Sequence, residues 1–135
     1  FNTDELDLAF NERDELWERS EEIMETYKGI ITQINNVVSD DPDNILTRSR
    51  LKNQADFYSL VGAFYVLNNE NTLPEINGIR ERLLRFVNYN VTEESPVLIK
   101  EYYEYARVAS NRTLARKERE KILKLVLLNQ IDYEA

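Results

Sequence analysis

Apolar side chains recur every seven residues along the first 38 residues, and this repeat constrains the fold more than any other feature. Three neighbouring rows carry the repeat: one from Phe10 through Trp17, Met24 and Ile31 to Val38, one from Ala9 to Val37, and one from Leu6 to Ile34 that Arg13 and Ser20 interrupt. Residues seven apart lie on the same side of an α-helix, so the rows form one apolar stripe. Its width suits a bundle helix better than a narrow two-stranded coiled-coil seam. We therefore predict a long amphipathic helix over residues 1–38, with a break near Asn11 as the alternative.

The rest of the chain predicts a helical bundle over residues 45–129, joined to the first helix by the loop Ser39–Asn44. Four helices are expected there, over residues 50–68, 72–87, 96–109 and 110–129. The first of these four is apolar on nearly all sides, which is typical of the buried middle of a bundle. The predicted fold is therefore all-α, a compact bundle of about five helices that forms a single domain over residues 1–135. The residues expected to be substantially buried are Trp17, Ile31, Tyr58, Phe64, Leu83 and Ile122.

Two of these helices have recognisable start signals. Thr72 and Glu75 have the spacing of a capping box, and Ser95-Pro96 is a favourable cap and first position. The helix after Pro96 places Leu98, Tyr102, Tyr105 and Ala109 on one face. Its tyrosines Tyr102, Tyr103 and Tyr105 could stack on nucleic-acid bases, but their helical spacing favours a place at the edge of the core.

The residue types missing from the chain exclude most kinds of active site. It contains no Cys and no His, which removes disulfides, thiolate metal sites and every Ser–His or Cys–His pair. The acids of the first helix lack the histidine partners of a di-iron bundle, so we expect a solvated face. No apolar run approaches the roughly 20 residues that span a bilayer. The sequence therefore predicts a soluble, cytoplasmic chain that binds no metal or cofactor and is not an enzyme by itself.

Charge is distributed unevenly along the chain. Residues 1–44 contain 13 acidic and three basic side chains, a net charge of −10, whereas residues 45–135 carry a net charge of +2. Six cations fall within residues 112–124, against two acids. We name as candidate nucleic-acid-binding residues Arg112, Arg116, Lys117, Lys121 and Lys124. The alternative is an ordinary exposed helix whose cations pair with the acidic first helix.

Two stretches of the chain are similar to a known family. Arg50-Leu-Lys-Asn-Gln-Ala-Asp-Phe-Tyr-Ser-Leu60 and Ala109-Ser-Asn-Arg-Thr-Leu-Ala-Arg-Lys-Glu-Arg119 resemble segments of the GmrSD-type domain-of-unknown-function family. In that family a helical region follows a ParB-like catalytic subdomain, and the members resemble nucleotide-dependent restriction and phage-defence proteins. The similarity covers residues 45–128 and lacks the family's Asp-Gly-Gln-Gln-Arg signature, because the sequence has no Asp-Gly step. The resemblance implies the helical C-terminal portion of such a protein, and no catalytic residue is carried over.

Two functions follow as expectations. The first is a non-catalytic helical accessory domain of a larger bacterial defence, restriction-type or DNA-processing protein, in contact with a neighbouring subdomain or subunit and weakly with nucleic acid. The second is a helical protein–protein interaction module that does not contact nucleic acid. The chain begins with Phe1, which fits a segment of a longer protein. The wide stripe of the first helix also predicts modest self-association through Trp17, Met24 and Ile31.

Overall fold

The computed structural model describes the backbone of residues 17–108 and 113–134 and the side chains of residues 21–41, 43–107 and 114–134. Its long helices are α2 (Trp17–Ser39), α4 (Gln54–Asn69), α5 (Ile76–Asn88), α6 (Val97–Val108) and α7 (Thr113–Leu127). Three short helical segments connect α2 to α4, namely η2 (Pro42–Asn44), α3 (Ile45–Arg48) and η3 (Arg50–Lys52). The described ranges contain no strand, so the all-α prediction is confirmed. No helix within them is long and apolar enough to cross a membrane.

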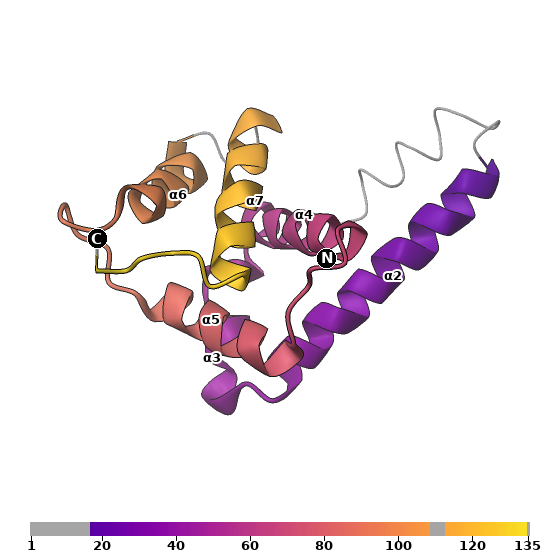
Figure 1. Cartoon of the computed structure of the whole chain (residues 1–135), viewed down its shortest axis with the longest axis horizontal. Coiled ribbons are helices and arrows are strands. Elements are labelled where there is room, and N and C mark those ends of the chain that lie inside the picture. Colours follow the sequence, from indigo (N-terminus) through magenta and orange to yellow (C-terminus); the bar gives the residue numbers. More distant parts are fainter. Residues whose placement is uncertain (1–16, 109–112, 135) are drawn as a thin grey trace.

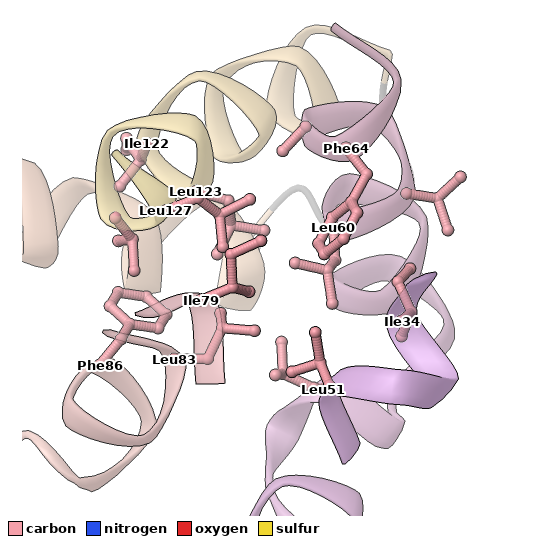
Figure 2. Close-up of a cluster of buried hydrophobic side chains, with 14 of the residues drawn as sticks. Ile34, Leu51, Leu60, Phe64, Ile79, Leu83, Phe86, Ile122, Leu123 and Leu127 are labelled. Carbon is pink, nitrogen blue, oxygen red and sulfur yellow. The ribbon is translucent and has the colours of Figure 1, made fainter. Parts of the chain in front are cut away.

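Helix α4 occupies the middle of the fold, as its apolar sequence predicts. Ala63, Phe64 and Leu67 are completely buried on it. It packs mainly on α7, which also packs on α6 and α5, while α2 lies along α5 and α4 at one edge (Figure 1). The buried side chains of these helices form one continuous apolar cluster (Figure 2).

Helix α2 contributes its C-terminal half to this core. Ile30, Ile34 and Val37 are buried, whereas Tyr27 and Ile31 are half-buried and pack against the edge of the core. The core is therefore not confined to the bundle predicted after residue 45. Residues 1–16, the first part of the predicted long helix, lie outside the described residues.

The burial predictions for the other named positions are confirmed in part. Phe64, Leu83 and Ile122 are buried, as expected, but Tyr58 is only half-buried. The side chain of Trp17 lies outside those that the structure describes. The reason for the lower burial of Tyr58 is its place near the start of α4, where its hydroxyl accepts a hydrogen bond from the exposed Gln54.

Both α4 and α7 end at an asparagine in the left-handed conformation. Asn71 has φ 57° and Asn129 has φ 59°. The residue after each asparagine donates a hydrogen bond back into the helix. Thr72 N donates to Leu67 O at 2.9 Å, and Gln130 N donates to Leu125 O at 2.8 Å. This hydrogen bond defines the Schellman motif, which satisfies a carbonyl that the helix itself leaves unpaired.

The predictions for where α5 and α6 begin are less accurate. The capping-box prediction is wrong, because Thr72 completes the end of α4 while α5 begins at Ile76 after Glu75, whose side chain caps nothing. Helix α6 begins at Val97, one residue later than predicted, and Ser95 Oγ accepts from Thr92 N in the preceding turn. The predicted core face of α6 is also wrong at Leu98, which is 38% exposed.

Two arginines of α5 hold the C-terminal ends of neighbouring helices. Arg80 Nε donates to Val37 O at 2.7 Å and its Nη2 donates to Asn36 O at 2.9 Å, at the end of α2. Arg82 Nη1 donates to Leu127 O at 2.7 Å, at the end of α7. Positive charge at these ends also offsets the negative end of each helix dipole. The arginines thus fix how α2 and α7 lie against α5.

We expect Arg80→Met to lower the free energy of unfolding by roughly 1–2 kcal/mol, because two helix-end carbonyls lose a charged donor. The side chain of Arg80 is 12% exposed, so water replaces those donors poorly. Arg107→Met is the control, since Arg107 is exposed and its recorded partner among the described residues is the exposed Glu104; this change should cost less than about 0.5 kcal/mol. Urea unfolding followed by circular dichroism measures both, and equal losses would contradict the assignment.

Candidate functional site

The predicted nucleic-acid-binding residues lie on or next to α7, but only part of the cluster is a free cationic surface. Arg112 lies outside the described residues, Arg116 is half-buried and Lys117 is exposed. Lys121 Nζ lies 3.2 Å from Glu118 Oε1, and Lys124 Nζ lies 2.9 Å from Glu70 Oε1 at the end of α4. Neither of these acids belongs to α2. Lys121 and Lys124 therefore do not form the ion pairs with the first helix that the alternative interpretation predicted.

Arg119 was counted in the basic cluster, yet it is completely buried. Its Nε donates to Ser59 Oγ of α4 at 3.1 Å, and its Nη1 donates to Tyr105 O of α6 at 3.1 Å. Burial lowers the pKa of Arg119, while the neighbouring Tyr102 and Asp56 act in the opposite direction. The signal was present in the sequence, because Arg119 continues the spacing of the buried residues Ala115, Ile122 and Val126.

A second buried polar group, Asp56, lies close to Arg119. Tyr102 Oη donates to Asp56 Oδ1 at 2.6 Å, and Arg50 Nε donates to the same oxygen at 3.2 Å. The guanidinium of Arg50 also covers the ring of Tyr103, 4.3 Å from its centroid. Asp56, Ser59, Tyr102, Arg50 and Arg119 are called the polar cluster below; together they join η3, α4, α6 and α7.

The protonation states in the polar cluster suit a structural role. Burial, followed by the charge of Asp56 and its hydrogen bond, raises the pKa of Tyr102 well above its usual value. Burial alone would lower the pKa of Arg50, but the charge and hydrogen bond of Asp56, together with Tyr102 and Tyr103, raise that pKa above its usual value. The phenol therefore stays a hydrogen-bond donor and the guanidinium stays charged at neutral pH. Tyr102 is completely buried and cannot stack on a base, so its place is in the core.

A further acid of α7 lies against α4. A side chain added at Gly62 of α4 would overlap the carboxylate of Glu120, so that carboxylate lies directly against α4 at Gly62. Burial raises the pKa of Glu120, and the nearby Lys117 and Arg116 partly oppose this rise. The negative charge of Glu120 therefore faces the same two cations that a phosphate would have to contact.

An apolar pocket of about 200 Å³ lies among α2, α3, η3, α4 and α5. Its wall includes Ile34 and Val37 of α2, Leu51 of η3, Leu60 and Phe64 of α4, and Leu83 of α5. Most of these side chains appear in Figure 2, where Ile34, Leu51 and Leu60 stand opposite Leu83. Exposed polar residues complete the lining on the solvent side, namely Asn35, Thr47 and Lys52. The sequence contains no signal for this pocket, because its walls come from five separate elements.

The size of the pocket limits what it can hold. Small-molecule and cofactor sites typically enclose roughly 300–1,000 Å³, whereas an engineered apolar cavity of about 150 Å³ takes up benzene. A space of about 200 Å³ therefore suits one large apolar side chain. No group of His, Cys, Asp and Glu among the described residues could hold a metal ion.

Comparisons of the chain with protein-family models, with curated proteins and with solved structures found no match. The resemblance to the GmrSD-type family therefore rests on the two similar stretches of sequence alone.

The polar cluster makes a direct prediction about Tyr102. Tyr102→Phe should lower the free energy of unfolding by about 1–3 kcal/mol, because the buried carboxylate of Asp56 loses a donor that water cannot replace. Tyr103→Phe is the matched control, since Tyr103 Oη forms no hydrogen bond within the described part of the chain. Denaturant unfolding of both variants measures the difference, and an equally small effect in both would argue against the hydrogen bond.

The raised pKa of Glu120 predicts a pH-dependent gain in stability. Because folding favours the protonated form, ionisation of Glu120 costs stability once the pH rises through its folded-state pKa. Glu120→Gln should therefore raise the free energy of unfolding at pH 7, by less than about 1 kcal/mol after solvent screening. The gain should shrink as the pH falls below the ordinary pKa of a glutamate, where Glu120 becomes protonated in both the folded and the unfolded state. An equal gain at pH 7 and at acidic pH would assign it to packing.

Proposed function

We propose that this chain is a non-catalytic helical accessory domain that acts as a protein-interaction module. Its binding site is the apolar pocket, which receives one large apolar side chain from a neighbouring protein segment. The observation that carries this proposal is the pocket itself, with about 200 Å³ of space, an apolar wall and a polar solvent side. Single anchor side chains inserted in such pockets supply much of the affinity of protein interfaces.

The geometry favours this function over nucleic-acid binding. A phosphate-binding face needs several free cations. In α7, Arg119 is buried and both Lys121 and Lys124 already pair with acids. Glu120 adds negative charge beside Lys117. The pocket, by contrast, offers an apolar wall around open space, so the interaction module is the better-supported function.

The resemblance to the GmrSD-type family supports a context for the module. In a protein of that kind the partner would be a neighbouring subdomain or subunit of a bacterial defence or restriction-type system. Self-association through α2 is a further arrangement that the proposal accommodates. Met24 and Ile31 are only half-buried within the single chain, so they retain apolar surface for such a contact.

The proposal is tested with small neutral probes that imitate one side chain. We expect N-acetyl-phenylalaninamide or N-acetyl-leucinamide, at millimolar concentrations, to shift the methyl resonances of Leu51, Leu60 and Leu83. Val38→Phe should abolish these shifts, because Val38 lines the pocket and the larger ring occupies it. Val97→Phe is the matched control, since Val97 is 63% exposed on α6 and does not line the pocket.

Two outcomes would contradict the proposal. One is the absence of any methyl shift with either probe, or equal shifts in the Val38→Phe variant. The other is salt-sensitive binding of a short DNA duplex in a fluorescence-anisotropy titration, lost in Lys117→Glu with Lys121→Glu. The second result would restore the phosphate-binding face of α7 as the functional site.

A further inference from the structure

We propose that the pocket selects an acidic partner, namely a protein segment that carries one large apolar side chain flanked by Asp or Glu. This inference rests on the proposed function, because it specifies which segment enters the same pocket. Two observations support it. Cationic side chains lie beside the opening of the pocket, and two of them form no ion pair with any described residue.

The chain that borders the opening is basic, in a protein whose net charge is −8. Residues 44–55 contain Arg48, Arg50 and Lys52 and no acidic residue. They belong to α3, η3 and the start of α4, which together form one side of the pocket. The charged side chains of this stretch are therefore all cationic, although the protein as a whole is acidic.

Two of these three cations are available to a partner. Arg50 is held by Asp56 in the polar cluster. Lys52 lines the pocket and is exposed, and its ammonium group forms neither an ion pair nor a hydrogen bond with any described residue. Arg48, which follows the lining residue Thr47, is exposed and donates only to the backbone oxygen of Asn44, at 3.4 Å. Lys52 and Arg48 are called the rim cations below.

The pattern contrasts with the lysines of α7, whose partners are already inside the molecule. Lys121 and Lys124 pair with Glu118 and Glu70, whereas nothing within the described residues neutralises the rim cations. A carboxylate next to an inserted apolar side chain would find them without breaking an existing ion pair. Charges at the rim of an apolar contact set partner choice and association rate more than total affinity. The rim cations therefore determine specificity, and the apolar wall supplies the binding energy.

The test uses three capped five-residue peptides: phenylalanine between two pairs of glutamates, phenylalanine between two pairs of lysines, and alanine between two pairs of glutamates. Binding is followed by the methyl resonances of the pocket at low salt. We expect the glutamate–phenylalanine peptide to bind about threefold to tenfold more tightly than the lysine one. The alanine peptide should not bind. The preference should shrink as salt rises, because the rim is exposed to solvent.

Charge-reversal variants assign the preference to the rim. Arg48→Glu with Lys52→Glu should reverse the order of the two phenylalanine peptides. Lys117→Glu with Lys121→Glu makes the same change in net charge on α7 and should leave the order unchanged. Lys52→Gln alone should weaken the preference, which covers the case in which the double variant fails to fold by circular dichroism.

The outcomes separate this inference from the proposed function. Equal binding of the glutamate and lysine peptides would overturn the acidic partner and leave the pocket as an interaction site. A reversed preference in the α7 variant would also overturn it, because the effect would then follow net charge. Binding of hexanoate as tight as that of the glutamate–phenylalanine peptide would assign the pocket to a small carboxylate instead. If neither peptide nor the neutral probes bind, the proposed function itself fails.

Discussion

The hydrogen bonds of Asp56 are the interaction on which the rest of the structure depends. A buried carboxylate is costly unless charge and hydrogen bonds compensate it, and here Tyr102 and Arg50 both donate to one of its oxygens. Arg119 lies nearby with its own partners on α4 and α6. These groups come from four elements, so α4, α6, α7 and η3 must meet in one arrangement for all of them to be satisfied. Apolar packing alone would allow more than one rotation of these helices, whereas the polar cluster does not.

This arrangement also explains why a pocket remains on the other side of α4. One face of the helix is held against α6 and α7 by the polar cluster, and Leu60 and Phe64 are left to face α2 and α5. On that side the ends of α2 and α7 are held by Arg80 and Arg82 of α5. Helices fixed at their ends and on one face cannot shift freely to fill the space between them. The cavity is therefore a consequence of constraints elsewhere, and Lys52 at its edge gives it a charge preference.

The basic segment of α7 shows how one stretch of sequence can serve several purposes. Arg119 is part of the interior, Lys124 joins α7 to the end of α4, and Lys121 pairs within its own helix. A count of charges gives the same weight to all three of these residues, although each of them already has a partner inside the molecule. The rim cations beside the pocket are fewer, but they are not engaged elsewhere. For this reason, the proposed function and the further inference both point to the apolar pocket and its rim cations rather than to α7.

The sequence by itself determined the fold class and the helical segments. The periodicity of α2, the apolar run of α4 and the asparagines that end α4 and α7 are local signals, because each depends on residues within a few turns of one helix. Only the tertiary structure decided that Arg119 is buried, that Leu98 is exposed and that Thr72 serves the end of α4 rather than the start of α5. The pocket and its rim were likewise beyond the sequence, because residues from α2 to α5 form them together. Such a site depends on how distant helices pack, and pattern within one segment carries no record of that packing.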